Sequence, residues 1–282
     1  MTVACNIPAE RERVAIMRQI GIEEGRHAFG ANAENYAAAR PEYPSSIYAR
    51  LRARCGLRTG TRTFEIGPGT GLATRRLLQS GASPLAAIEP DARLAQYLRQ
   101  QLPDPALQVI HATFETASLP EAAFDLGVSA TAFHWMDQHA ALAKVATLLK
   151  PGGWWAAWWN VFGDPEQDDA FHDATRHLLE GGTTPSYSPA FKHPFALDRG
   201  ARIADIESTK AFENIDTETE RWTLTLDPKE TRALYASFST FAVLDEAERN
   251  RILDAIENIA AIEFGGRVTR NICTPIYIAR RR

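Results

Sequence analysis

The chain has 282 residues, of which 45% are hydrophobic and 23% charged, and its formal net charge is −4 at pH 7. This length allows one large hydrophobic core with a cap, and the acidic balance gives no overall case for nucleic-acid binding. The sequence contains no run of about 18 apolar residues, so it predicts no membrane span. Its first residues also lack the pattern of a secretory signal. We therefore expect a globular protein that binds neither nucleic acid nor membrane.

Cysteines and histidines are few and widely spaced. Cys5, Cys55 and Cys273 form no C-x-x-C pair and cannot all pair within the chain, which is typical of a reduced, cytoplasmic protein. Monomer and homodimer both stay open. His172 and His177 are five residues apart, whereas metal ligands on one helix favour spacings of three or four. We expect no metal.

The first part of the chain predicts a helical cap. Helical periodicity runs over residues 8–24 and 29–40, and a further helix is predicted up to Cys55. The expected organisation is an N-terminal cap or lid over residues 1–44 and a main domain over residues 45–282.

Strands and helices then alternate along the chain. Five strands are predicted at Thr61–Ile66, Leu85–Glu89, Leu107–His111, Phe124–Ser129 and Trp154–Asn160. The helices among them are predicted at 72–80, 91–102 and 138–149. Such alternation predicts an α/β fold: a doubly wound, mostly parallel sheet with helices on both faces.

The alternation breaks after the fifth strand. Residues 160–200 contain a helical pattern at 166–180 and a loop rich in Gly, Thr, Ser and Pro, which is typical of an insertion that covers a substrate. The alternation then partly resumes, with strands within 214–226 and at 271–279 and with helices at 228–238 and 245–262.

The segment Glu65-Ile66-Gly67-Pro68-Gly69-Thr70-Gly71 follows the first predicted strand and leads into a helix. Glycines at every second position let the backbone turn sharply and approach a ligand closely. A dinucleotide-binding fingerprint would read G-x-G-x-x-G, but its third glycine would fall at Leu72. The loop therefore favours a ligand with a ribose and a cationic amino-acid tail over one with a pyrophosphate.

An acidic residue closes the second predicted strand. Glu89 lies 22 residues beyond Gly67 and is followed by Pro90. In an open α/β sheet the carboxyl ends of the strands carry the ligand site, and a carboxylate there can accept hydrogen bonds from both ribose hydroxyls. The glycine loop and this acid together predict a nucleoside-binding site.

With these motifs, residues 60–160 resemble the class I S-adenosylmethionine (SAM)-dependent methyltransferases. The resemblance implies a Rossmann-like sheet of seven strands, the last one antiparallel, and SAM as the cofactor. It also implies that Glu65 and the loop backbone hold the methionine part of SAM and that Glu89 holds the ribose. The other implied cofactor contacts are Pro90, Thr113, Phe114, Ser129 and Ala130.

Two further segments resemble a subgroup of small-molecule methyltransferases near the trans-aconitate and ubiquinone-biosynthesis types. Phe133-His134-Trp135 follows the fourth strand, and in that fold this loop faces both the sulfonium and the acceptor. The segment from Asn35 to Pro44 resembles a lid over the SAM site, with Tyr36 and Arg40 as the implied contacts.

An acceptor pocket is expected where aromatic residues meet the ends of strands. In Trp154-Trp155-Ala156-Ala157-Trp158-Trp159, alternate side chains face opposite sides of a strand that is covered on both faces, so core packing is the first expectation. The C-terminal end of this strand opens toward the site. The candidate pocket residues are Phe133, His134, Trp135, Trp158, Trp159 and Asn160.

His134 has two alternative roles. Methyl transfer from a sulfonium is an in-line displacement, so alignment and exclusion of water can supply most of the catalysis. A base is needed only where a proton of the acceptor must leave early, and an ordinary histidine titrates in the range suited to that task. The alternative is a structural histidine beside the cofactor.

We therefore expect a SAM-dependent methyltransferase that acts on an oxygen or nitrogen atom, less readily on carbon, of a small molecule, with aromatic acceptors included. Two other classes stay open: an NAD(P)-dependent oxidoreductase on a related sheet, and a non-enzymatic SAM-binding protein. Leu72 argues against the first, and the intact glycine loop and Glu89 argue against the second. An RNA or protein methyltransferase is less favoured, because the chain is acidic and lacks an Asn/Asp-Pro-Pro-Tyr motif.

Overall fold

The structure is a computed structural model that describes residues 19–187 and 193–282. Most of the predicted helix at 8–24 lies outside the described residues, as does Cys5. The first described helix, α1, covers Ile22–Arg26.

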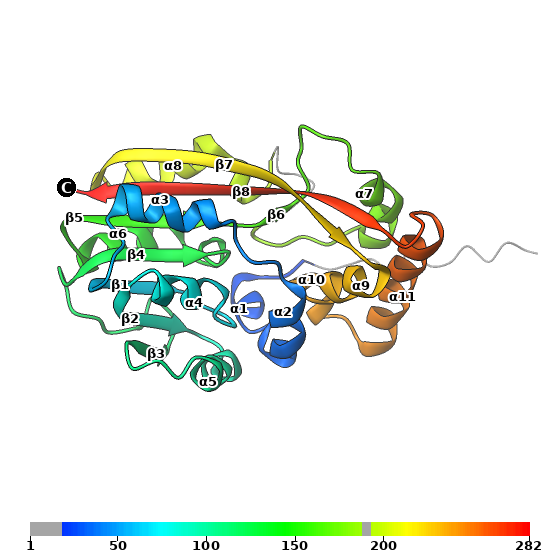
Figure 1. Ribbon diagram of the computed structural model, residues 1–282, viewed down its shortest axis with the longest axis horizontal. Helices are drawn as coiled ribbons and strands as arrows, with labels where there is room; N and C mark the ends of the chain where they lie inside the picture. The colour runs from blue at the N-terminus through cyan, green and yellow to red at the C-terminus, as the bar shows by residue number, and fades with distance from the viewer. Residues whose placement is uncertain (1–18, 188–192) are drawn as a thin grey trace, which may run out of the picture.

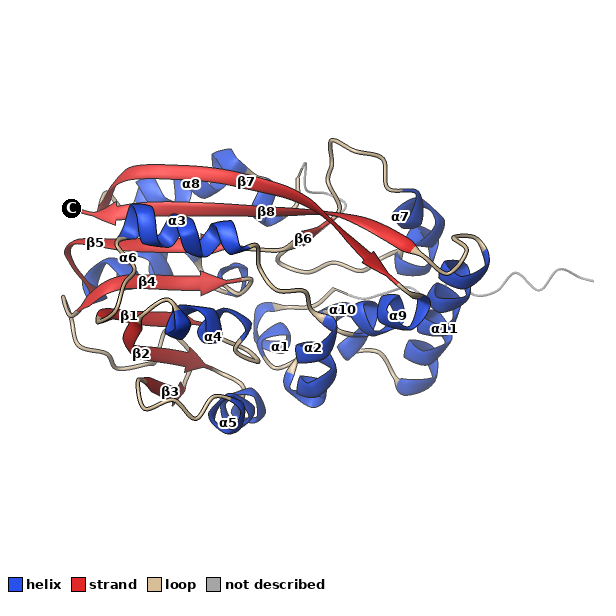
Figure 2. Ribbon diagram, in the orientation of Figure 1, coloured by secondary structure: helices blue, strands red, loops and turns tan. Residues whose placement is uncertain are grey.

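The described residues form one eight-stranded sheet at the centre of the molecule (Figures 1 and 2). Its strands are β1 (Thr61–Ile66), β2 (Ala82–Glu89), β3 (Leu107–His111), β4 (Phe124–Ala130), β5 (Leu149–Trp158), β6 (Val161–Phe162), β7 (Phe212–Leu226) and β8 (Val268–Arg281). The order is β3-β2-β1-β4-β5-β8-β6, and β7 pairs with β8. Strands β1 to β5 pair in parallel, whereas β8 is antiparallel to its neighbours. The predicted mostly parallel sheet is confirmed, and the two-residue β6 is the addition to the seven expected strands.

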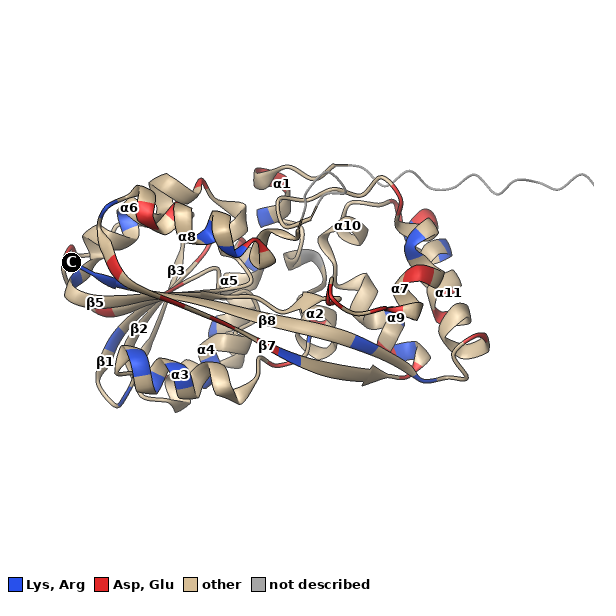
Figure 3. Ribbon diagram, turned by 90° about the horizontal axis from the view of Figure 1, so that it is seen from above, with Lys and Arg blue, Asp and Glu red and all other residues tan. Residues whose placement is uncertain are grey.

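Helices cover both faces of this sheet, as the alternation predicts. The helices that follow α1 are α2 (Ala33–Ala39), α3 (Ser45–Cys55), α4 (Leu72–Gln79), α5 (Ala92–Gln101), α6 (Gln138–Leu148), α7 (Ala170–Thr175), α8 (Arg199–Ser208), α9 (Pro228–Ala236), α10 (Ser239–Ala242) and α11 (Glu246–Ile262). Short 3₁₀ turns are η1 (Gly30–Asn32), η2 (Phe133–Trp135), η3 (Arg176–Leu179) and η4 (Phe195–Leu197). Seen from above, α6 and α8 lie on one side of the sheet and α3 and α4 on the other (Figure 3).

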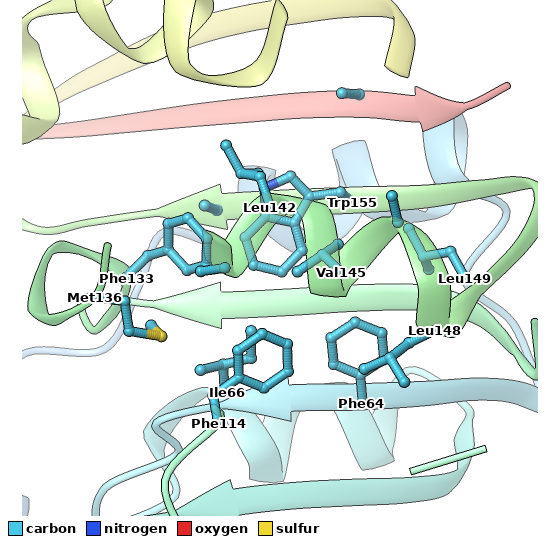
Figure 4. Packing of buried hydrophobic residues seen from close by; sticks show 14 of the residues in the cluster. Phe64, Ile66, Phe114, Phe133, Met136, Leu142, Val145, Leu148, Leu149 and Trp155 are labelled. Carbon is cyan, nitrogen blue, oxygen red and sulfur yellow. The ribbon is translucent and has the colours of Figure 1, made fainter. Parts of the chain in front are cut away.

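Apolar side chains fill the space between each face of the sheet and its helices. On one face, Phe64 and Trp155 pack in a cluster with Leu142 and Val145 of α6 (Figure 4). Full burial of such a side chain contributes roughly 1.5–3 kcal/mol. Because a second cluster packs on the other face, the central strands have nearly continuous apolar sequences. These two clusters hold the carboxyl ends of the strands in fixed positions.

A third apolar cluster lies beyond the parallel strands. β7 and β8 form a long antiparallel ribbon that reaches to α7, α9 and α11 (Figure 1). There Phe171, Tyr235 and Phe241 are buried together. Phe171 belongs to the predicted insertion 160–200, so part of that insertion packs against the C-terminal helices.

Several elements differ from the sequence prediction, and β5 and α8 are two of them. β5 begins at Leu149 rather than at Trp154, because Leu149 already pairs with Phe124 before a register shift. α8 was not predicted, and Ile206 is its one buried residue. Its start is nevertheless encoded locally, since Asp198 accepts a hydrogen bond from the N–H of Ala201.

Among the described residues, no helix combines the length and the hydropathy that a membrane span requires. Cys55 and Cys273 are both free and buried. Within the described ranges, no group of three His, Cys, Asp or Glu side chains is arranged to hold a metal ion.

Candidate active site

A cleft opens at the carboxyl ends of β1, β2 and β4, where the strands face α1 and α2 (Figure 1). This is the edge at which open α/β sheets bind ligands. The predicted cofactor residues that line it are Tyr36, Gly67, Pro68, Gly69, Thr70, Glu89, Pro90, Thr113, Phe114 and Ala130. Residues that are distant in the sequence therefore converge as the motifs predict.

The glycine loop forms the floor of the cleft between β1 and α4. Gly67 has φ +66°, and an added Cβ would lie 2.4 Å from the Cβ of Ala132. Gly69 has φ +57°, but an added Cβ would meet no atom within 4 Å. The first glycine is needed for close packing, whereas the second leaves space inside the cleft where a ligand can approach the backbone.

Glu89 lies at the end of β2 and faces this loop. One carboxylate oxygen accepts a hydrogen bond from the N–H of Gly69 at 3.0 Å, and the other accepts one from the N–H of Asp91 at 3.0 Å. Burial raises the pKa of Glu89 to about 7, although the bonds from Asp91 and Gly69 lower it. The carboxylate is thus oriented by the backbone and still borders the cleft, as a ribose acceptor requires.

Glu65 lies beneath the loop rather than in the wall of the cleft. Its Oε2 accepts a hydrogen bond from the Thr74 hydroxyl at 2.7 Å, whereas Oε1 is buried and has no partner among the described residues. Burial raises the pKa of Glu65 to about 8, and the nearby Glu89 adds to the shift. A buried carboxylate oxygen without a partner is costly, so this site favours a hydrogen-bonding or cationic ligand.

The predicted adenine contacts, Thr113 and Phe114, follow β3 and line the cleft. Arg26 of α1 closes this side: it donates to the backbone carbonyl of Trp135 at 2.9 Å and to Glu115 at 2.5 Å. These bonds join the N-terminal segment to two loops of the sheet. Arg26 and Glu115 were not predicted as site residues.

The described part of the predicted cap supplies the remaining wall. Phe29, Tyr36 and Tyr43 all line the cleft. The Tyr43 hydroxyl is 2.8 Å from that of Thr131, which follows β4. Burial raises the pKa of Tyr43, so its hydroxyl stays protonated. The cap therefore contacts the cleft through these aromatic rings, the Tyr43–Thr131 hydrogen bond and the hydrogen bonds of Arg26.

His134 is close to the cleft but does not line it. Its Nδ1 accepts a hydrogen bond from the indole Nε1–H of Trp159 at 3.0 Å, so the proton of the neutral ring is on Nε2. Burial, with smaller contributions from Arg202 and Arg40, lowers its pKa to about 3. In this arrangement neither nitrogen offers a lone pair to an acceptor, which favours the structural alternative for His134.

The predicted acceptor residues separate into two sides of the sheet, and of the six only Trp135 lines the cleft. Phe133 and Trp159 belong to the core on one face, and Trp158 belongs to the core on the other, as the alternation predicts. Asn160 is held by bonds to Pro41 and Thr274. Trp158 and Trp159 pack in the core and Asn160 is bonded to its neighbours, so none of the three lines the described cleft.

The other predicted contacts lie just behind the cleft wall. The Ser129 hydroxyl donates to the carbonyl of Ile66, and Gly71 is the N-cap of α4. Arg40 stacks between aromatic rings behind Tyr36. In the described part of the predicted insertion 160–200, no residue lines the cleft.

Several lining residues escaped sequence analysis. They are Arg26, Phe29, Tyr43, Ile66, Leu72, Ala73, Ile88, Leu94, Glu115, Thr131, Ala132 and Met136. Tyr43 lies within the segment from Asn35 to Pro44, and Thr131 lies just before Phe133-His134-Trp135. These two motifs could therefore have identified them as cleft residues. Arg26 and Phe29 come from a segment with no motif, and no sequence signal identifies them.

The residues of the cleft fit the chemistry of SAM. Glu89 offers an oriented carboxylate to the ribose, and the space above Gly69 admits a ligand close to the backbone. Glu65 Oε1 and Thr70 Oγ1 are buried without partners at the glycine loop, as expected for groups that meet the polar amino-acid tail. The fit rests on atoms of the ribose subsite and of the amino-acid subsite.

Comparisons with known proteins support the same assignment. Residues 64–157 match a family model described as a methyltransferase domain. An uncharacterized methyltransferase of Mycobacterium tuberculosis is 31% identical over 134 residues, which cover 48% of this chain and 52% of that protein. The chain thus spans about half the length of the curated relatives it matches.

Solved structures share the fold. One, from Anaeromyxobacter dehalogenans, is provisionally assigned as a type II methyltransferase. It matches with a TM-score of 0.56 and 22% identity, and the match covers 86% of this chain and 97% of the other chain. Phosphoethanolamine N-methyltransferase 2 of Haemonchus contortus, solved with SAM, has a TM-score of 0.54 and 12% identity over 89% of this chain and 57% of its own. These similarities support the predicted family and SAM as its cofactor, whereas the trans-aconitate-like subgroup is not confirmed.

Proposed function

We propose that this class I SAM-dependent methyltransferase domain transfers a methyl group to an oxygen or nitrogen atom, less readily to carbon, of a small molecule. The observation that carries the proposal is the joint placement of Glu89, the open backbone at Gly69 and the unpartnered Glu65 Oε1 at one sheet edge. The two carboxyl groups offer hydrogen-bond acceptors to ribose hydroxyls and to a cationic tail, whereas a pyrophosphate needs donors at this position.

The residues act mainly by binding and alignment. When bound, SAM supplies an activated methyl group: the sulfur–carbon bond breaks as the methyl carbon bonds to the acceptor, and S-adenosylhomocysteine remains. Glu89 orients the ribose, and Thr113 and Phe114 border the adenine. Phe29, Tyr36 and Tyr43 close the cleft from the cap and exclude water. Such alignment can supply much of the catalysis of a displacement reaction.

Proton removal from the acceptor has little support from the described cleft. His134 is engaged with Trp159, and Tyr43 has a raised pKa. Glu89 has a pKa of about 7 but is assigned to the ribose. The acceptor atom is therefore one from which no base has to remove a proton at neutral pH, such as an ionised oxygen or an unprotonated amine.

The two rival classes are less well supported. An NAD(P)-dependent oxidoreductase would need a pyrophosphate site, and the family model matched by residues 64–157 is that of a methyltransferase domain. A non-enzymatic SAM-binding protein needs no open path to an acceptor. Trp135, Met136 and Thr131 border the cleft where such a path would lie.

The test is formation of S-adenosylhomocysteine from SAM across a panel of small carboxylic acids, phenols and amines. We expect turnover with at least one class, and Glu89→Ala should raise the KM for SAM by about 5- to 150-fold, equivalent to 1–3 kcal/mol for a lost ionised acceptor. Glu121→Ala, which removes an exposed carboxylate, is the matched control and should leave KM unchanged.

Two outcomes would contradict the proposal in different ways. Tight binding of S-adenosylhomocysteine with no turnover across the panel would favour a non-enzymatic SAM-binding protein. Binding of NAD without binding of SAM or S-adenosylhomocysteine would favour the oxidoreductase.

A further inference from the structure

Thr131 has an unusual backbone conformation inside the cleft. It follows β4, lines the cleft and has φ +55°. Left-handed backbone is unfavourable for side chains in general, and a β-branched side chain there is a clear outlier. Of the four described non-glycine residues with positive φ, Ala122, Thr131, Lys210 and Asn214, Thr131 is the one that is β-branched and the one that lines the cleft. Backbone strain of this kind is concentrated at functional sites.

Two hydrogen bonds hold Thr131 in this conformation. Its N–H donates to the carbonyl of Trp158 at 2.8 Å, and its hydroxyl oxygen lies 2.8 Å from that of Tyr43 in the cap. The first bond uses only the backbone, so a glycine at this position would make it without strain. What a glycine cannot supply is the hydroxyl group.

The hydroxyls of Tyr43 and Thr131, together called the hydroxyl pair, carry one proton more than their own bond uses. Each hydroxyl has one proton, and the bond between them takes one of the two, whichever group donates. Among the described residues, neither hydroxyl has a further hydrogen-bond partner. Because both residues line the cleft, a spare hydrogen-bond donor is available to a ligand there.

The sheet places the hydroxyl pair beside the glycine loop. Ile66, the last residue of β1, is in register with Ser129 of β4, so the segments that leave these two strands run side by side. The two segments are in close contact, because a Cβ on Gly67 would lie 2.4 Å from that of Ala132. β2, which carries Glu89, pairs with the other edge of β1. The pair therefore borders the glycine loop on the side away from the ribose acceptor.

The amino-acid tail of SAM carries an ammonium and a carboxylate on the same carbon, so both charges have to be met near the glycine loop. Glu65 Oε1, which is buried without a partner, is an acceptor suited to the ammonium. The carboxylate needs donors, and Arg26 is the one Lys or Arg side chain among the described residues that line the cleft. Arg26 is bonded to Glu115 after β3, on the adenine side. The donors left for the carboxylate are therefore neutral groups.

We propose that the hydroxyl pair of Tyr43 and Thr131 binds the carboxylate of the cofactor's amino-acid tail; this inference rests on the proposed function. The spare proton of the pair donates to a carboxylate oxygen, and a hydrogen bond to an ionised acceptor is stronger than one between neutral groups. Because Tyr43 belongs to the cap and Thr131 to the sheet, the same contact attaches the cap to the bound cofactor.

Two ligands that differ only in the carboxylate test this inference. S-Adenosylhomocysteine and 5′-S-(3-aminopropyl)-5′-thioadenosine, which is S-adenosylhomocysteine without its carboxylate, are titrated by calorimetry into wild type and variants. We expect Thr131→Val and Tyr43→Phe to weaken binding of S-adenosylhomocysteine by about 5- to 20-fold and binding of the aminopropyl analogue by less than about twofold. Thr131→Ser keeps the hydroxyl and should bind S-adenosylhomocysteine within about twofold of wild type.

The control variants separate binding from folding. Thr225→Val is the matched control: it removes a hydroxyl that lies 3.3 Å from that of Thr269, outside the cleft, and should leave both affinities unchanged. Thr131→Gly relieves the strained backbone and also removes the hydroxyl. Its melting temperature without ligand should exceed that of Thr131→Val, while its affinity for S-adenosylhomocysteine should be as low.

A double variant tests whether the two hydroxyls act together. Thr131→Val with Tyr43→Phe should weaken S-adenosylhomocysteine binding by less than the product of the two single effects, because each single change already breaks the pair.

The outcomes are distinct. Unchanged affinity for S-adenosylhomocysteine in Thr131→Val and Tyr43→Phe would overturn the inference. Equal losses for S-adenosylhomocysteine and the aminopropyl analogue would also overturn it, because the pair would then act on another part of the ligand or only on the fold. Failure of both ligands to bind wild type would instead reject the proposed function.

Discussion

The indole Nε1–H of Trp159 donates to Nδ1 of His134 at 3.0 Å, and this bond joins the residue after β5 to the turn after β4. Both side chains are buried. The bond fixes the neutral tautomer of His134 and removes its only free lone pair. The turn that ends in Trp135 is thereby attached to the core.

His134→Phe should therefore lower stability more than it changes the pH dependence of turnover. The unpaired indole N–H left behind costs about 1–3 kcal/mol in unfolding free energy. Chemical denaturation of His134→Phe, Trp159→Phe and the double variant measures this, and the double variant should lose less than the sum of the single ones. A drop in turnover of about 10²-fold with unchanged stability would restore the role of a base.

The same histidine predicts a stability change in acid. Its pKa falls from an ordinary 6.5 to about 3 in the folded protein, so between these values the unfolded chain binds a proton that the folded chain does not. Stability should therefore decrease as pH falls from about 6.5 toward 3. His134→Phe should show a smaller decrease over this range than wild type, and equal pH slopes would contradict the assignment.

Glu65 predicts the opposite dependence in the ligand-free protein. Burial raises its pKa from 4.5 to about 8, so the folded chain keeps a proton that the unfolded chain loses in between. Stability should fall as pH rises from about 4.5 to 8. Glu65→Gln keeps an acceptor for the Thr74 hydroxyl and cannot ionise, so its melting temperature should exceed that of wild type by at least about 3 °C at pH 8.5. A lower melting temperature at that pH would show that ionised Glu65 stabilises the fold.

Gly69 and Gly56 form a matched pair for the shape of the cleft. Both have left-handed backbone, with φ +57° and +69°, and an added Cβ meets no atom within 4 Å at either position. Gly69→Ala and Gly56→Ala should therefore cost similar stability, about 1–2 kcal/mol each. Only Gly69→Ala should also weaken binding of S-adenosylhomocysteine, by tenfold or more in calorimetry. Equal affinities in the two variants would place the cofactor elsewhere.

Arg26 should control how long the cofactor stays bound. Its bonds to the carbonyl of Trp135 and to Glu115 connect α1 with the loops across the cleft. Arg26→Ala should speed dissociation of S-adenosylhomocysteine by about tenfold, measured by stopped-flow fluorescence, because charged hydrogen bonds contribute about 1.5–3 kcal/mol. Arg199→Ala removes an arginine that bonds Thr217 away from the cleft and should have no effect. An unchanged rate in Arg26→Ala would mean that α1 does not retain the ligand.

The sequence was informative where local chemistry determines structure. β1 and β3 have the predicted bounds, and the glycine loop and Glu89 meet as expected, because strand periodicity and glycine spacing are local signals. α8 was not predicted, although its N-cap Asp198 is a local signal.

The acceptor side depended on tertiary contacts that sequence patterns do not contain. Alternation along β5 correctly separated Trp158 from Trp159 and predicted core packing on both faces, but it could not show that this packing extends to the C-terminal end of the strand. The sequence pattern also could not show that the indole N–H of Trp159 donates to Nδ1 of His134. This bond depends on the rotamers of two residues 25 positions apart. Arg26 and Phe29 reach the cleft from a segment without any motif.

The most direct measurement is a crystal structure of the protein with S-adenosylhomocysteine. We expect the ribose hydroxyls to bind the carboxylate of Glu89 and the adenine to lie beside Thr113 and Phe114. We expect the amino-acid tail to reach the glycine loop above Glu65. A nucleoside bound away from Glu89, or an empty cleft in crystals grown with saturating ligand, would contradict it.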